Sequence, residues 1–201
     1  SSAASDVYKR QVHALRPKRV GILAPSFSGY AWAAQTVGAE VCSIPLQEEN
    51  NFAMDMAQME SLCRQLDGNS LLFLANPANP AGNKMEASLL ETLLDVCEKK
   101  QITVVLDECF IAFTGTEGYV SWIRKYPHLI VVRAYTKIYA IPGIRLGYGI
   151  TSNLELLEKM ERKRFSVTFF LRKARTNKSG LTPILARITT NGVSKEVYIQ
   201  C

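Results

Sequence analysis

The sequence predicts an α/β fold, in which a mostly parallel sheet lies between two layers of helices and is followed by a small antiparallel β segment. Between residues 19 and 132, short continuous apolar runs alternate with longer segments whose apolar residues recur at helical spacing. Such runs are typical of parallel strands that are buried on both faces. From residue 160 onward, strand-like runs separated by turn residues replace this alternation.

The first elements follow this pattern directly. Arg19 to Ala24 is an apolar run that ends before a proline, which predicts a buried strand. Gly29 to Gly38 predicts a short helix, and Glu40 to Pro45 predicts a second strand. A further helix opens at Asp55 and stops near Gly68. Its residues at helical spacing are expected in the core: Met56, Met59, Cys63 and Leu66.

The next elements repeat the alternation. Leu71 to Ala75 is a predicted strand, and a helix follows a turn-rich segment from about Met85 to Lys100. Ile102 to Leu106 and Leu129 to Val132 are again continuous apolar strands. Ligands bind at the carboxyl ends of the strands in parallel sheets, so the residues directly after these runs are candidate functional residues. The inner face of the second long helix is expected to consist of Leu89, Leu90, Leu93, Leu94 and Cys97.

Composition excludes several classes of protein. The chain is 47% hydrophobic and 21% charged, as is usual for a globular protein. It contains no apolar run of about eighteen residues or more, so no membrane span is expected, and the absence of a signal peptide predicts a cytoplasmic protein. The five cysteines show no CxxC or metal-ligand spacing. We therefore expect buried free thiols and no metal site.

The positive charge is concentrated at one end of the chain. Residues 1–159 contain 15 Lys and Arg against 16 Asp and Glu, whereas residues 160–201 contain 9 against 2. The net charge of +6 therefore arises in the last fifth of the chain. This asymmetry predicts two segments with different partners, with a nucleic acid as the partner of the second.

Two of the predicted strands end in polar residues. Residues 76–82 read N-P-A-N-P-A-G directly after one strand, and the prolines favour an irregular turn that aims an asparagine amide into a cleft. Asp107 closes the strand from Ile102 to Leu106. A carboxylate there is costly to bury unless it meets a cation. The alternative interpretation of Asp107 is a helix cap.

One lysine follows the strand from Leu129 to Val132. Lys137 lies before a Pro-Gly turn at residues 142–143, and Arg145 follows eight residues after it. This layout is that of a Schiff-base lysine followed by a phosphate-binding arginine. A lysine amine attacks a carbonyl only when it is neutral, so a desolvated setting is expected. A solvated loop lysine is the alternative interpretation.

The motifs at residues 76–82, 107–110 and 136–148 together resemble the fold-type I pyridoxal-phosphate enzymes. They read N-P-x-N-P-x-G, D-E-x-F, T-K and R-L-G-Y, in the order and spacing of the aspartate aminotransferase superfamily. Within it, the chain is most similar to the threonine-phosphate decarboxylases, with the histidinol-phosphate aminotransferases as close relatives. The resemblance covers residues 12–159 and implies a partial large domain of this fold.

The resemblance assigns roles to individual residues. Lys137 would link to pyridoxal phosphate and move the proton at the α carbon of the substrate, and Asp107 would pair with the pyridine nitrogen. Phe110 stands where the aminotransferases have a tyrosine, so the hydrogen bond of that hydroxyl is missing, as is frequent in the decarboxylases. The other cofactor contacts implied are the 3-hydroxyl for Asn79, the ring face for Phe27, and the phosphate for Thr136 and Arg145.

The resemblance also implies the activity. The parent enzyme would be a homodimer that acts on a phosphorylated amino acid, decarboxylating threonine phosphate for cobalamin synthesis or, alternatively, transaminating histidinol phosphate. The glycine-rich phosphate loop and the small domain of the family have no counterpart in the chain, so this truncated chain is expected to be inactive. Residues 1–11, S-S-A-A-S-D-V-Y-K-R-Q, match a translated sequencing adaptor and are expected to lie outside the fold.

Residues 160–201 resemble the arm DNA-binding domain of Bacteroides-type tyrosine recombinases. The resemblance rests on F-x-V-x-F-F-L-R-K, N-K-x-G-x-x-P-I-x-A-R-I-T and a following N-G turn. A solvated basic face is the alternative interpretation. We therefore predict a join of two unrelated coding fragments near residue 159. Phosphate contacts on DNA are expected from Arg172, Lys173, Arg175, Lys178 and Arg187.

Overall fold

The structure is a computed structural model that describes residues 3–141, 147–161, 165–171, 184–190 and 193–199. Side chains are described for residues 8–141 and 147–160. The chain divides into two compact units, Ser1–Leu156 and Leu157–Cys201. Each unit is described here by itself.

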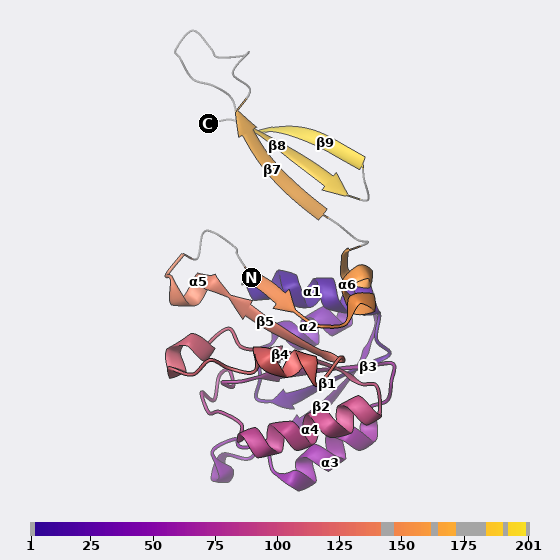
Figure 1. The fold of residues 1–201 in the computed structure, drawn as a ribbon, viewed down its shortest axis with the longest axis vertical. Helices are drawn as coiled ribbons and strands as arrows, with labels where there is room; N and C mark the ends of the chain where they lie inside the picture. The colour runs from indigo at the N-terminus through magenta and orange to yellow at the C-terminus, as the bar shows by residue number, and fades with distance from the viewer. Residues whose placement is uncertain (1–2, 142–146, 162–164, 172–183, 191–192, 200–201) are drawn as a thin grey trace. The chain divides into compact units, whose positions relative to one another are not determined.

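The first unit is built on a six-stranded sheet with the order β2-β1-β3-β4-β5-β6 (Figure 1). The first five strands are parallel, and β6 pairs with β5 in the antiparallel direction. This arrangement confirms the predicted α/β class with a mostly parallel sheet. The strands are β1 (Arg19–Ala24), β2 (Glu40–Pro45), β3 (Ser70–Ala75), β4 (Thr103–Asp107), β5 (Leu129–Ala134) and β6 (Gly147–Ile150).

Helices cover both faces of this sheet (Figure 1). Helices α1 (Ala3–Leu15) and α2 (Gly29–Gln35) lie on one face, and α3 (Met56–Gln65) and α4 (Ala87–Lys99) lie on the other. The three-layer arrangement follows from strands that are apolar on both sides, such as β4, in which every residue is buried. The remaining helical segments are η1 (Glu48–Asn50), η2 (Ile111–Thr114), η3 (Val120–Arg124), α5 (Tyr135–Ile138) and α6 (Leu154–Glu161).

A cluster of core residues lies between the sheet and the layer of α3 and α4. It includes Leu62 of α3 together with Leu90 and Leu94 of α4, all at most 2% exposed. Helix α3 begins with a capping box, because the Asp55 carboxylate accepts a bond from Gln58 N at 2.7 Å and the Gln58 side chain accepts one from Asp55 N. The helix therefore opens where the sequence predicts.

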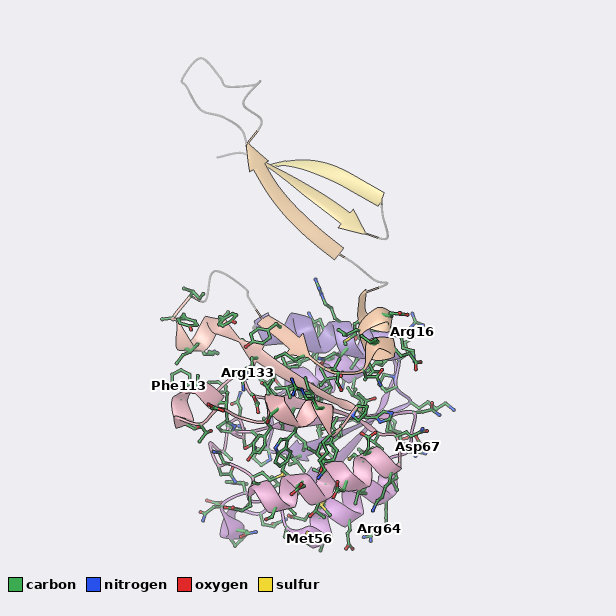
Figure 2. All side chains as sticks on the ribbon, viewed as in Figure 1. Arg16, Met56, Arg64, Asp67, Phe113 and Arg133 are labelled. Atoms are coloured by element: carbon green, nitrogen blue, oxygen red, sulfur yellow. The ribbon has the colours of Figure 1, made fainter. Side chains whose placement is uncertain are left out.

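One predicted core residue lies at the surface instead. Met56 is 49% exposed and is labelled at the lower margin of Figure 2, whereas Met59 is 2% exposed. Met56 is the first residue of α3, and the buried residues of this helix begin one turn later, at Met59. Helical spacing alone placed it on the inner face, so that prediction is wrong.

The amino-terminal residues also differ from the expectation. Helix α1 contains Tyr8 and Gln11, each 1% exposed, although residues 1–11 were expected to lie outside the fold. Val12, on the same helix, is fully buried. In the structure, this segment packs against the rest of the first unit, because Tyr8 and Val12 present apolar surface on one side of the helix.

The second unit contains a three-stranded antiparallel sheet with the order β7-β8-β9. Its strands are β7 (Phe165–Leu171), β8 (Ile184–Thr190) and β9 (Val193–Ile199). They confirm the antiparallel β segment that the turn and strand patterns predict. The unit begins at residue 157, close to the predicted boundary after residue 159.

The described cysteines agree with the sequence prediction of free thiols. Cys42, Cys63, Cys97 and Cys109 are all free and buried. In the part of the chain that the structure describes, no helix is both long enough and apolar enough to cross a membrane.

Candidate active site

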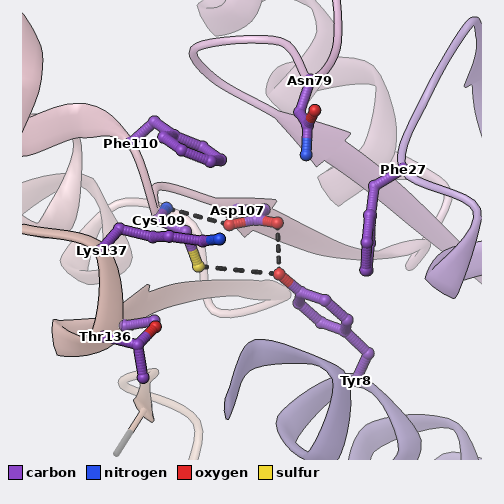
Figure 3. A pocket seen from close by; sticks show the side chains of 9 residues that line it. Tyr8, Phe27, Asn79, Asp107, Cys109, Phe110, Thr136 and Lys137 are labelled. Atoms are coloured by element: carbon purple, nitrogen blue, oxygen red, sulfur yellow. Dashed lines mark hydrogen bonds between the residues drawn. The ribbon is translucent and has the colours of Figure 1, made fainter. Parts of the chain in front are cut away.

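A pocket opens at the carboxyl ends of four parallel strands, β1, β3, β4 and β5 (Figure 3). Its empty volume is about 400 Å³, a figure that includes the open mouth. Every described residue that the sequence predicts to contact a cofactor lies around this pocket. The lining residues are Tyr8, Phe27, Asn79, Asp107, Cys109, Phe110, Ala134, Thr136 and Lys137.

The strand order explains why these residues meet. Strand β2 lies on one side of β1 and β3 on the other, so the chain reverses its direction of winding beside β1. The register places Asp107 opposite Ala75 of β3 and Val132 of β5. Asn76 N donates to Asp107 O at 2.9 Å, which holds the loop after β3 beside the end of β4. The loops after these strands therefore open into one site.

Asp107 is the most deeply placed acidic group of the pocket, at 8% exposure. Its carboxylate accepts hydrogen bonds from the hydroxyls of Tyr8 and Tyr30 and, at 2.9 Å, from Cys109 N. Among the described residues it forms no ion pair, and all three of these donors are neutral. The bond to Cys109 N closes a turn and not a helix, since η2 begins only at Ile111.

The neighbouring hydroxyls and thiol stay protonated at neutral pH. Burial, followed by the charge of Asp107, raises the pKa of Tyr8 and of Tyr30 well above that of a free tyrosine. The same two causes raise the pKa of the Cys109 thiol. Cys109 is therefore a packing residue in this pocket and lacks the thiolate that a nucleophile needs.

Lys137 extends from the short helix α5 into the pocket (Figure 3). Its side chain is exposed, and its Nζ lies 5.9 Å from the centre of the Phe110 ring. The expected desolvated setting is therefore absent, although the lysine faces the pocket as predicted. Figure 3 shows the rings of Phe110 and Phe27 on two different sides of the pocket.

Thr136 and Asn79 supply uncharged polar groups. Thr136 is 7% exposed, and its hydroxyl oxygen is buried without a hydrogen-bond partner among the described residues. A buried hydroxyl without a partner is costly, which points to a ligand group that it would bind. The Asn79 amide points into the pocket from the loop after β3 (Figure 3). Arg145, the predicted phosphate ligand, lies outside the described residues.

Sequence reasoning missed several residues of the site. Tyr8 and Tyr30 contact Asp107 from helices that are distant in sequence, 99 and 77 residues away. Arg133 forms an ion pair with Glu108, the residue after Asp107, at 2.7 Å. The available signals were a tyrosine at the start of the helix after β1 and an arginine four residues before Lys137. The position of neither residue in the sequence identifies the side chain that it contacts.

The predicted DNA contacts fall in the second unit. Arg187 belongs to β8 and pairs with Thr168 of β7 and Glu196 of β9 in backbone register. The other four predicted contacts, Arg172, Lys173, Arg175 and Lys178, lie outside the described residues.

Comparison with known protein families gives one match. Residues 1–190 match the family described as aminotransferase class I and II. The match extends past residue 159, across the predicted junction, and it includes the first eleven residues.

Two of the similar proteins found by sequence have different activities. A threonine-phosphate decarboxylase of Salmonella typhimurium is 37% identical over 151 residues, which are 75% of this chain and 41% of that protein. Histidinol-phosphate aminotransferase 2 of Idiomarina loihiensis is 33% identical over 147 residues, which are 71% of this chain and 40% of that protein. The chain thus spans less than half the length of these relatives.

Two similar solved structures carry the names of the same two activities. The histidinol-phosphate aminotransferase of Clostridium acetobutylicum superposes with a TM-score of 0.73 at 32% identity, covering 80% of this chain and 47% of that one. The L-threonine-O-3-phosphate decarboxylase of Porphyromonas gingivalis superposes with a TM-score of 0.62 at 27% identity, covering 78% and 44%.

Proposed function

Because this chain belongs to the aminotransferase class I and II family, whose cofactor is pyridoxal phosphate, we propose that its first unit is part of an enzyme acting on a phosphorylated amino acid. One observation carries the proposal. Lys137, Asp107, Asn79 and Thr136 come from three different strand ends and line one pocket. An amine, a carboxylate, an amide and a hydroxyl in that arrangement match the groups that this cofactor requires.

The pocket residues fit pyridoxal phosphate. The unpartnered Thr136 hydroxyl suits a phosphate oxygen. Asp107 Oδ1 accepts one described bond, from Cys109 N, so a second lone pair is free for a pyridinium N–H. Asn79 would bind the 3-hydroxyl, and Phe27 would lie against the ring face. When bound, the cofactor supplies an electron sink for the bond that breaks at the α carbon.

The protein groups would then position the substrate and move its proton. Lys137 has the reach and the mobility of an exposed amine to take and return a proton at the substrate α carbon. Asp107, buried and surrounded by donors, would hold a positive charge on the ring nitrogen. Arg145 would add charge at the phosphate.

We favour decarboxylation of threonine phosphate to aminopropanol phosphate over transamination of histidinol phosphate. Phe110 supports this choice, since it lines the pocket without the hydroxyl that a tyrosine would supply there. The relatives of both activities leave transamination of histidinol phosphate as the alternative. In either case, the intact enzyme would be a homodimer.

A direct experiment titrates the chain with pyridoxal phosphate and then supplies each candidate substrate. Release of carbon dioxide from threonine phosphate supports the decarboxylase, and formation of a keto product from histidinol phosphate with an acceptor supports the aminotransferase. Failure to bind pyridoxal phosphate would contradict a functional site in this chain.

The Thr136 hydroxyl provides a test of the phosphate contact. Replacing Thr136 with valine should weaken pyridoxal phosphate binding by about 10- to 100-fold, the usual effect of losing a hydrogen bond to a charged group. The ligand-free chain should be equally or more stable, because the buried hydroxyl has no described partner. Titration followed by absorbance measures the first effect, and thermal unfolding measures the second. Thr136→Ser keeps the hydroxyl and should bind as the wild type does; equal binding by all three proteins would contradict the contact.

A second candidate function is DNA binding by residues 160–201. The three-stranded antiparallel sheet and the excess of 9 basic over 2 acidic residues favour it. Arg172→Ala and Arg187→Ala should each weaken binding to duplex DNA to a similar extent for any sequence, and the affinity should fall steeply with salt. Fluorescence anisotropy with a labelled duplex measures both effects, and Arg64→Ala on the exposed side of α3 serves as the control. Binding that is indifferent to salt would contradict this function.

We further propose that residues 12–159 and 160–201 come from two unrelated coding fragments. The abrupt change in charge and in hydrophobic period near residue 160 supports a junction, as does the division into two compact units near residue 157. One uninterrupted DNA read across codons 150–170 of the source material tests it. If the read continues with aminotransferase-like sequence past residue 159 and contains no recombinase-like sequence, the junction is an assembly artefact. If the read reproduces the junction, the gene is a fusion.

A further inference from the structure

An ion pair with a buried carboxylate lies beside the pocket but does not line it. Glu108 follows Asp107, and its side chain is 0% exposed. Arg133 Nε and Nη2 both donate to Glu108 Oε2, at 2.9 and 2.7 Å. Burial raises the pKa of the Glu108 carboxyl, and the bonds from Tyr119 N and Arg133 oppose that rise. A buried carboxylate is costly, so its full set of partners indicates a specific role.

The loop after η2 closes over this pair. Tyr119 N donates to Glu108 Oε1 at 2.6 Å, and Arg133 Nη2 also donates to Glu117 O. Gly118 has a φ of +76°, and a Cβ there would lie 2.6 Å from both carboxylate oxygens. Only glycine therefore allows the backbone to approach the carboxylate so closely. The Glu108 carboxylate is thus enclosed by backbone as well as by side chains.

The pair joins the two strand ends that carry the reactive groups. Successive residues of a strand point to opposite faces, so Asp107 faces the pocket and Glu108 faces away from it. On β5, Ala134 lines the pocket and Arg133 points to the other side, three residues before Thr136. Glu108 N also donates to Val132 O at 2.8 Å. A movement of one strand end would therefore break bonds to the other.

We propose that Glu108 and Arg133 are positioning residues that hold the Asp107 carboxylate and the segment carrying Thr136 and Lys137 at a fixed separation. Two arguments support this role. Arg133 donates both an Nε–H and an Nη–H to Glu108 Oε2, and these two bonds fix the orientation of the guanidinium group as well as its distance from the carboxylate. The pair also lies within one residue of Asp107 and within four of Lys137. The ligand part of this inference rests on the proposed function, whereas the coupling of the two strand ends does not.

Two conservative variants test the inference in the full chain. Glu108→Gln keeps the size and an acceptor for Tyr119 N but removes the charge, and Arg133→Lys keeps the charge but removes the two-point contact. In both variants, hydrogen exchange of the backbone amides at Cys109 and in α5 should be about tenfold faster than in the wild type, as expected for the loss of one charged hydrogen bond. The dissociation constant for pyridoxal phosphate should rise about tenfold for the same reason.

Two controls separate positioning from general stability. Glu91→Gln removes an exposed ion pair with Lys125 that is equally short, at 2.6 Å, and should change neither measurement. Leu62→Ala opens a cavity in α3 and should lower the melting temperature without changing exchange at Cys109 and α5 or the affinity for pyridoxal phosphate.

The possible outcomes are distinct. Faster hydrogen exchange and weaker pyridoxal phosphate binding in Glu108→Gln and Arg133→Lys, but in neither control variant, would support the positioning role. Wild-type exchange and affinity in both variants would overturn it, as would equal changes in Leu62→Ala. If the wild-type chain itself binds no pyridoxal phosphate, the proposed function fails, and the exchange measurements alone decide whether the pair couples the two strand ends.

Discussion

Lys137→Ala should abolish the covalent attachment of pyridoxal phosphate to the chain while leaving the fold intact. Only a primary amine at this position can form the carbon–nitrogen bond to the cofactor aldehyde. The side chain is exposed and belongs to the four-residue helix α5, so its removal should change the free energy of unfolding by no more than about 0.5 kcal/mol. In the intact enzyme, turnover should fall at least about 10²- to 10⁴-fold, the range for losing a general acid–base group.

Borohydride reduction followed by peptide mass spectrometry measures this attachment. The wild-type chain should carry the modification on the peptide that contains Lys137, and Lys137→Ala should carry none. Lys137→Arg should also fail, because a guanidinium stays protonated and cannot act as the nucleophile. Lys84→Ala, which removes another exposed lysine bonded to Thr116, is the matched control and should be modified as the wild type is. Attachment retained in Lys137→Ala would show that this lysine does not hold the cofactor.

Replacing Asp107 with asparagine should weaken the site strongly without unfolding the chain. The amide keeps an acceptor oxygen for the buried hydroxyls of Tyr8 and Tyr30. It removes the negative charge that would stabilise a protonated ring nitrogen, so turnover of the intact enzyme should fall about 10²- to 10³-fold. The affinity for pyridoxal phosphate should fall as well. Steady-state kinetics and absorbance titration measure the two effects.

Asp107→Ala separates the structural from the chemical role of this residue. It leaves both buried tyrosine hydroxyls without their acceptor, which should cost about 1–3 kcal/mol of stability for each one. Urea denaturation should therefore distinguish alanine from asparagine at this position. Asp67→Asn, at an exposed carboxylate that is 55% accessible, is the control and should change neither stability nor binding appreciably. An asparagine variant with wild-type affinity and turnover would exclude a charge role for Asp107.

The strand and helix pattern was readable from the sequence because it depends on local periodicity. Strands β1 and β2 lie where the apolar runs predict them, and α3 begins after the predicted cap at Asp55. The placement of Asp107 and Lys137 around one pocket was also readable, since the carboxyl ends of parallel strands meet at one edge of the sheet. Short elements without a strong period, such as α5 and β6, were missed.

By itself, the sequence determined the α/β class, the family motifs and the groups that face the pocket, because motif spacing and strand ends are properties of local segments. Only the tertiary structure decided which partners these groups have. Asp107 accepts hydrogen bonds from two tyrosine hydroxyls, Glu108 pairs with Arg133, and Lys137 is exposed. These outcomes depend on how helices and loops that are distant in sequence pack against the sheet. The hydrophobic period of a helix or strand predicts which of its faces is buried, but it does not identify the element that packs against that face.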